Sequence, residues 1–336
     1  LAEFFVSTKA SYNYAAWQQT YYIMASLMLI GVVTTLLIKE PTATREQHER
    51  PMSDYFQLFL LFLISVIALI ASFIVIGHVL PETESKFFGF VYESTKFIGA
   101  VAIAIGTALV LLKAKIIKKQ VAVDMWVAPI QDFFIRYGKK AVWLILLIGL
   151  YRISDIVAGT TSNLFYVNLG FSKTDIALAV KTFGMGMSIV GGILGGLLAE
   201  RFKIMNAMLI GAILASASNL LFVVLAGKGH DFFYMYSAVM FDNLASGLAS
   251  AIFVAFLSVL TNIRFSMVQY ALLSSLMTLT PKILGGYSGA MVETMGYPAF
   301  FTFTALIGIP VLLLIYMVDK HVMSQDATRG DNITHE

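Results

Sequence analysis

Two residues of opposite charge stand at the end of a very apolar run, where they could carry charge-dependent chemistry. The run AVWLILLIGL (141–150) leads into Tyr151 and Arg152, and Asp155 follows three residues later. In a helix, the spacing i, i+3 places both charged side chains on one face, close enough to pair. Charges at membrane depth are costly and mark candidate functional sites. The structural alternative is an ion pair that only fixes helix packing.

The composition predicts a polytopic helical membrane protein. Of the 336 residues, 58% are hydrophobic and 13% are charged, and the mean hydropathy is +0.81. A soluble domain has about 25% charged residues. The absence of cysteine excludes disulfides, thiolate catalysis and cysteine-ligated metals. The histidines lie at no ligand spacing, so we expect neither a metal site nor a cofactor.

About nine spans are predicted, because a transmembrane helix needs about 20 mostly apolar residues. Lysine and arginine gather in alternate loops, including residues 39–54 and 113–140, which places these loops and the tail in the cytoplasm. In the second loop, Pro129 predicts the start of a short interfacial helix. The predicted spans are 17–38, 55–77, 87–112, 141–167, 175–198, 206–226, 232–260, 266–290 and 298–318.

A lysine lies within a predicted span that is rich in glycine. Lys181 shares a helical face with Gly184, Ser188, Gly191 and Gly195. Small residues at this spacing let helices approach closely. An ammonium group on such an interface needs an anionic partner or ligand, and Asp155 and Asp242 are the candidate partners.

Two further predicted spans have polar faces. In the first, Asp242 and Asn243 begin a face that Ser246, Gly247 and Ser250 continue. In the second, Ser275, Thr278 and Lys282 share a face, and Pro281 interrupts the backbone hydrogen bonds just before the lysine. A static kink without a functional role is the alternative for the second span.

Several stretches resemble known carriers. The segment GGLLAERFKIMNA (195–207) resembles a cytoplasmic loop of major facilitator transporters. More specifically, the chain resembles the AmpG-type muropeptide permeases, most clearly between Ala128 and Pro310. The stretches that carry this resemblance are APIQDFFIRYG (128–138), YRISD (151–155), VKTFG (180–184), SASN (216–219), FDNLASG (241–247) and FSMVQYALLSSL (265–276).

The resemblance implies an all-α major facilitator fold whose amino-terminal half is largely missing from this chain. On that view, residues 1–38 end the amino-terminal helix bundle. Residues 39–140 hold two extra transmembrane helices with cytoplasmic connections. Residues 141–320 form the carboxy-terminal six-helix bundle, and residues 321–336 form a cytoplasmic tail.

The resemblance also implies a function, namely proton-driven import of anhydro-muropeptides across the bacterial inner membrane for peptidoglycan recycling. The partners would be a sugar-peptide substrate, protons and lipid, without nucleic acid. Asp155 or Asp242 would carry the proton, since burial raises the pKa of a carboxylate and a nearby cation lowers it. The residues expected to bind the anionic, hydroxyl-rich substrate are Arg152, Lys181, Asn243, Gln269, Ser275 and Lys282.

Three alternatives remain open. A related permease could carry another anionic solute, such as an acyl-coenzyme A. An intramembrane enzyme is disfavoured, because no histidine or cysteine lies in a predicted span to serve as base, nucleophile or ligand. A membrane receptor without transport activity, or a non-functional transporter fragment, is the third alternative.

Overall fold

The computed structural model describes residues 14–38, 51–79, 86–114 and 118–323. Within these ranges every regular element is a helix, and eight helical stretches are long and apolar enough to cross a membrane. The chain is therefore an all-α, multi-pass membrane protein, as predicted. The predicted tail from residue 324 onward lies outside the described residues, and the predicted domain boundaries stay a prediction.

The first compact unit, Leu1–Pro51, holds helix α1 (Tyr14–Leu37). Most of its large apolar side chains, such as Leu27, Ile30 and Leu36, are exposed. A continuous apolar surface of this kind is unfavourable in water and normal against lipid.

The second unit, Met52–Glu336, begins with two long helices that pack against each other, α2 (Met52–Val79) and α3 (Lys86–Lys113). At the start of α2, Asp54 pairs with Lys118 at 2.8 Å. Lys118 precedes the short helix α4 (Lys119–Ala122). The pair thus connects α2 to the segment that leads into the helix bundle.

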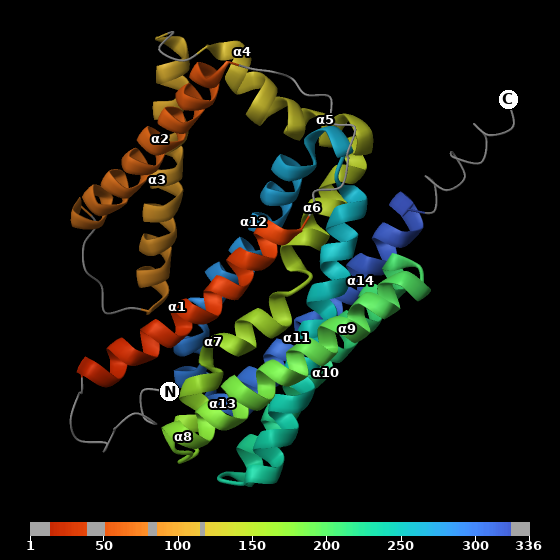
Figure 1. The fold of residues 1–336 in the computed structure, drawn as a ribbon. Helices are drawn as coiled ribbons and strands as arrows, with labels where there is room; N and C mark the ends of the chain where they lie inside the picture. The colour runs from red at the N-terminus through yellow and green to blue at the C-terminus, as the bar shows by residue number, and fades with distance from the viewer. Residues whose placement is uncertain (1–13, 39–50, 80–85, 115–117, 324–336) are drawn as a thin grey trace, which may run out of the picture. The chain divides into compact units, whose positions relative to one another are not determined.

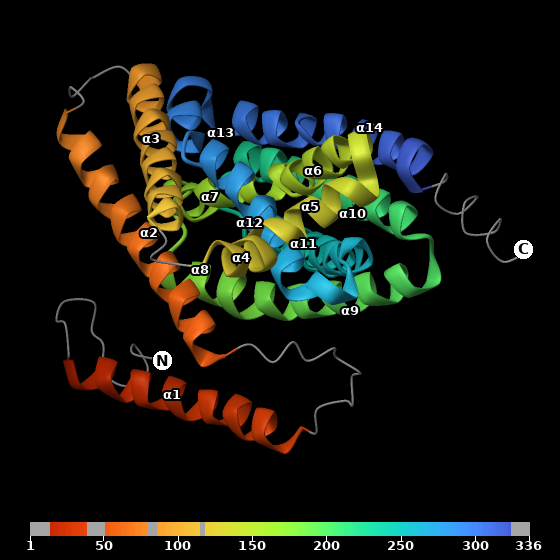
Figure 2. The same ribbon diagram turned by 90° about the horizontal axis from the view of Figure 1, so that it is seen from above.

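The remaining helices form a bundle around one hydrophobic core (Figures 1 and 2). Helix α11 packs along α9 and α10. Stacked and edge-on rings of Phe165, Phe222 and Phe301 fill part of the core. After α4 the elements are η1 (π-helix, Val123–Val127), α5 (Ala128–Tyr137), η2 (3-10 helix, Gly138–Lys140), α6 (Ala141–Leu150), α7 (Ile153–Asn168), α8 (Lys173–Ile176), η3 (π-helix, Ala177–Phe183), α9 (Gly184–Arg201), α10 (Ile204–Lys228), α11 (Phe232–Leu260), η4 (3-10 helix, Ile263–Phe265), α12 (Ser266–Gly285), α13 (Ser288–Leu306), α14 (Gly308–Val318) and η5 (π-helix, Asp319–Met323).

The count of eight stretches differs from the nine predicted spans because of α12. This helix has 20 residues, but Gln269, Pro281, Lys282 and several hydroxyl groups make it less apolar than the others. It ends at Gly285, and helical structure resumes at Ser288. The next break in helical geometry is at Gly296 inside α13, where φ is 78°. This break lies between the predicted spans 266–290 and 298–318.

Candidate functional site

Arg152 and Asp155 form an ion pair at an interruption between α6 and α7. The backbone of Arg152 (φ −101°, ψ 17°) departs from helical geometry. Its Nε donates to Oδ2 of Asp155 at 3.1 Å, and its Nη2 donates to the same oxygen. The two side chains are 16% and 5% exposed. The predicted pairing of these residues is confirmed.

Ser246 of α11 is a third member of this pair. Nη2 of Arg152 donates to Oγ of Ser246 at 2.8 Å. The same hydroxyl lies 3.3 Å from Oδ2 of Asp155, to which it donates. The charge pair of α7 is thereby connected to a different helix of the bundle.

Asp242 lies one turn before Ser246 on α11 and is half-buried. Its carboxylate is in electrostatic range of Asp155 and Arg152. It makes no hydrogen bond or ion pair with any residue in the described ranges. Two carboxylates therefore lie in the field of one guanidinium group, so the cluster carries an excess negative charge only when both carboxylates are ionised.

Lys181 lies in the π-helical segment η3, and its side chain is exposed. It makes no hydrogen bond or ion pair with Asp155, with Asp242 or with any other described residue. The expectation that it shares the tight glycine face is wrong. Gly191 and Gly195 are buried against α11. The π-helical hydrogen-bond pattern takes more residues per turn and so shifts Lys181 away from that face.

Lys282 and Ser275 are both exposed on α12. Lys282 follows Pro281 and makes no polar contact within the described part of the chain. Oγ of Ser275 donates to the carbonyl of Ala271 at 2.7 Å, within its own helix. Just beyond Lys282, the break between α12 and α13 packs on α7, where the hydroxyls of Thr160 and Ser288 lie 2.5 Å apart.

The three predicted cations thus have one feature in common. Arg152 lies at the break between α6 and α7, Lys181 lies in a π-helix, and Lys282 lies between a proline and a break. Interrupted helices leave backbone N–H and C=O groups without the hydrogen bonds of a regular helix. In membranes, such interruptions occur where the backbone is buried in protein or lines a water-filled cavity. π-helical turns also occur often at functional sites.

Gln269 lies elsewhere, in a buried network that joins α5 to the α11–α12 corner. Its Oε1 accepts from Nη2 of Arg136 at 3.1 Å and from the backbone N–H of Asn262 at 2.7 Å. Its Nε2 donates at 2.8 Å to the carbonyl of Pro129 and to Oδ2 of Asp132. Gln269 is 2% exposed. Because its amide is fully engaged, the structure favours a structural role over the predicted substrate contact.

The side chain of Asn243 is also engaged, since Nδ2 donates to the carbonyl of Val239 at 2.9 Å. It packs against the start of α9, where a Cβ added at Gly184 would lie 2.9 Å from Nδ2 of Asn243. The backbone carbonyl of Asn243 accepts from Oγ of Ser188 at 3.3 Å, while its side-chain oxygen Oδ1 has no hydrogen-bond partner among the described residues. The predicted role of Asn243 in substrate binding stays a prediction.

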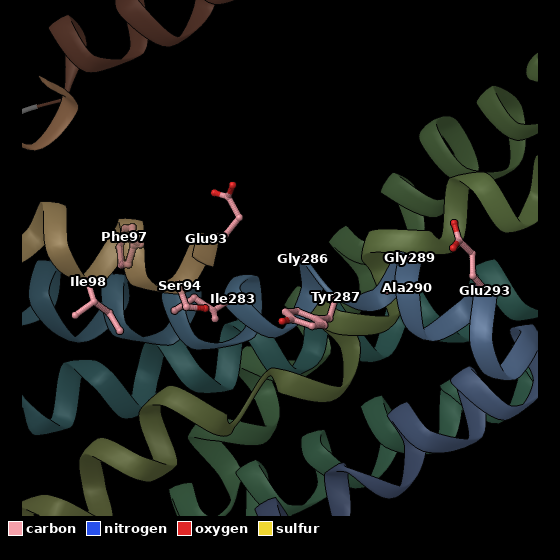
Figure 3. Close-up of a pocket in the computed structure, with 10 residues that line it drawn as sticks. All are labelled: Glu93, Ser94, Phe97, Ile98, Ile283, Gly286, Tyr287, Gly289, Ala290 and Glu293. Atoms are coloured by element: carbon pink, nitrogen blue, oxygen red, sulfur yellow. The ribbon is translucent and has the colours of Figure 1, made fainter. Parts of the chain in front are cut away.

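A separate apolar groove of about 690 Å³ lies between α3 and the α12–α13 break (Figure 3). Phe97 and Ile98 line it from α3, and Ile283 and Tyr287 line it from the other side. None of the predicted site residues borders this groove. It is therefore distinct from the charged cluster.

The sequence of the chain is similar to those of several permeases and transporters. No family model matches the chain. The anhydromuropeptide permease of Escherichia coli (strain K12) is 37% identical over 191 residues, which is 56% of this chain and 38% of that protein. AmpG 4 of Rickettsia conorii, a candidate transporter, is 29% identical over 206 residues, or 60% of this chain and 49% of that protein. The chain is homologous to AmpG-type permeases.

The match to these AmpG proteins is partial in both directions. The chain spans less than half the length of the two relatives. A further AmpG 4 protein, from Rickettsia felis, is 30% identical over 194 residues and is covered to 46% of its length. These relatives are named as permeases or transporters, and none of the three is named as an enzyme.

Two features of this AmpG homologue were not predicted from its sequence. Ser246 was assigned to a polar face but not to the site, although its i, i+4 spacing from Asp242 could have suggested it. The π-helical turn around Lys181 had no recognisable signal in the sequence. Both features depend on contacts between helices that are distant in the chain.

Proposed function

We propose that the complete gene product containing this chain imports anhydro-muropeptides with protons across the bacterial inner membrane for peptidoglycan recycling. The observation that carries the proposal is the 37% identity to the E. coli anhydromuropeptide permease over 191 residues. Within a major facilitator carrier, residues 141–320 would form the carboxy-terminal bundle. The lysines and arginines of alternate loops support a cytoplasmic carboxy terminus.

The exposed cations support an anionic substrate. Lys181 and Lys282 are both exposed and have no carboxylate partner among the described residues. An ammonium group at membrane depth is unfavourable unless an anion or water reaches it. The carboxylates of a muropeptide peptide would meet this requirement, and Ser275 and Asn243 would hydrogen-bond its hydroxyl and amide groups.

The charged cluster supports proton coupling. Arg152, Asp155 and Asp242 together carry two negative charges and one positive charge when all are ionised. A single proton bound to either carboxylate makes the cluster neutral. Neutralising a buried charge lowers the free energy of moving the helices that hold it through a low-dielectric region. This is the property that a proton-driven carrier requires.

Uptake of labelled anhydro-muropeptide tests the proposal. The complete gene is expressed in a bacterial strain that lacks its own muropeptide permease. We expect accumulation that a protonophore abolishes. Asp155→Asn or Asp242→Asn should retain exchange but lose accumulation. The matched control is Lys173→Gln, which changes an exposed charge outside the cluster. Absence of uptake by the wild-type protein at normal membrane abundance contradicts the proposal.

A further inference from the structure

The serines of α11 differ in the groups that receive their hydroxyl protons. Three of them donate within the helix, to the carbonyl four residues earlier. These bonds run from Ser237 to Phe233 at 2.8 Å, from Ser250 to Ser246 at 2.6 Å and from Ser258 to Val254 at 2.9 Å. Ser246 instead directs its hydroxyl to the Arg152–Asp155 pair of α7. Among the serines of α11, it is the exception.

The direction of the bonds around Ser246 follows from chemistry. A guanidinium group has only donors, so Oγ of Ser246 must accept from Arg152. The one hydroxyl proton is then free for Oδ2 of Asp155. Oδ2 thus accepts from Arg152 and Ser246 together, while Oδ1 has no partner in the described part of the chain. A proton arriving at Asp155 finds Oδ1 open.

Protonation of Asp155 removes the charge that holds the hydroxyl of Ser246. Hydrogen bonds to an ionised carboxylate are stronger than bonds to a neutral one. Ser246 then has a ready alternative acceptor, the carbonyl of Asp242 four residues earlier in its own helix, in the geometry that Ser250 and Ser258 already use. The change needs only a rotation of the Ser246 hydroxyl, and no covalent bond of the serine breaks.

We propose that Ser246 is a positioning residue that couples the charge of Asp155 to α11. Its hydroxyl donates to Asp155 when that carboxylate is ionised and to the carbonyl of Asp242 when the carboxylate is protonated. The hydrogen-bonded connection between α7 and α11 then exists in full in one protonation state and is weakened in the other. This inference rests on the proposed proton-coupled function.

The packing of α11 keeps Ser246 directed at α7. The neighbouring Gly247 lies so close to α9 that an added Cβ would overlap the carbonyl oxygen of Ser188 and reach the backbone N of Gly192 at 3.1 Å. Rotation of α11 about its axis is therefore restricted. A substitution at Ser246 therefore acts by changing its hydroxyl group, and not by rotating α11.

Other ionisable groups near the pair have different partners or none. Arg152 donates to Asp155 and Ser246. The hydroxyl of Tyr151 donates to the carbonyl of Met208 at 3.2 Å. Asp242 lies on α11, and Tyr166 of α7 is in electrostatic range of Asp242. The exposed Lys181 belongs to η3, which packs against α11. Of these ionisable groups, only Asp155 accepts the hydroxyl of Ser246.

Uptake as a function of external pH tests the coupling in the complete gene product. We expect Ser246→Ala to lower accumulation about tenfold, the effect of losing a hydrogen bond to a charged group, and to flatten its pH dependence. Ser246→Thr keeps the hydroxyl and should restore both. Ser258→Ala is the matched control, because its hydroxyl bonds within α11. A wild-type pH profile in Ser246→Ala, or equal losses in Ala and Thr, overturns the inference.

A second measurement needs no transport and so separates this inference from the proposed function. The chain has no cysteine, so Ser246→Cys introduces a single thiol. Its labelling by a neutral methanethiosulfonate is followed with Asp155 and with Asp155→Asn. Removal of the neighbouring negative charge, with Arg152 retained, should speed labelling about tenfold, because the thiolate is the reactive form. Equal rates in the two backgrounds overturn the inference even if uptake fails.

Discussion

Two neighbouring glycines of α9 allow close helix packing to be measured apart from helix propensity. Gly191 is buried against α11, where an added Cβ would overlap the carbonyl oxygen of Leu244 and lie 3.0 Å from its Cα. At the next position, a Cβ on Gly192 meets nothing within 4 Å. The perturbation is the same single methyl group at both sites, introduced as Gly191→Ala and Gly192→Ala.

The expected difference follows from these contacts. Both substitutions gain helix propensity, up to about 1 kcal/mol in the free energy of unfolding. Overpacking costs about 1–3 kcal/mol, and only Gly191→Ala incurs it, because the opposing group is backbone and cannot rotate away. We therefore expect Gly191→Ala to be less stable than Gly192→Ala by about 1–3 kcal/mol.

The assay is unfolding of the purified protein in mixed micelles with increasing dodecyl sulfate, followed by far-ultraviolet circular dichroism. Gly195→Ala and Gly196→Ala provide a second matched pair. A Cβ on Gly195 would lie 2.9 Å from Cα of Leu248, and one on Gly196 meets nothing within 4 Å. Equal free energies of unfolding within both pairs would refute the close approach of α9 and α11.

Three further predictions concern function and topology. Asp155→Ala should abolish most uptake, because it leaves Arg152 buried and unpaired at a cost of about 3–5 kcal/mol; normal uptake at normal abundance contradicts this. Lys181→Gln should weaken binding of anionic muropeptide and reduce its salt dependence, while Lys181→Arg should keep both, as measured by ligand affinity across a salt series. An unchanged glutamine variant would remove Lys181 from the site. A cysteine at the exposed Lys139 should resist an impermeant reagent applied outside intact cells, while a cysteine at the exposed Lys173 should react; the reverse pattern would invert the predicted topology.

The sequence predicted the features that depend on local spacing. Apolar runs of sufficient length predicted the helices, and the i, i+3 spacing predicted the pairing of Arg152 with Asp155. The apolar runs also predicted an interval between the spans 266–290 and 298–318, and Gly296, which leaves helical geometry, lies in that interval. In each case the determining groups lie within a few residues of one another.

Features that depend on distant contacts were missed. Gln269 carries the same amide whether it faces a substrate or a neighbouring helix, and its partners Arg136 and Asp132 lie 133 and 137 residues away. The position of Lys181 depends on one π-helical segment that no local sequence pattern predicts. Ser246 received its partners only when α7 and α11 came together.

The network around Gln269 has a consequence for biosynthesis. Asp132 and Arg136 on α5 are translated more than 130 residues before the glutamine that completes their hydrogen bonds. At about 5–20 residues per second, that separation corresponds to about 7–27 s during which six helices, α6 to α11, emerge from the ribosome. The Asp132–Arg136 pair at 2.9 Å lies within α5 and needs no later segment, whereas the bonds to Leu260 and Asn262 need the end of α11 and the turn after it. Completion of the network is therefore a late event in membrane insertion, and it can occur only after α12 has been synthesised.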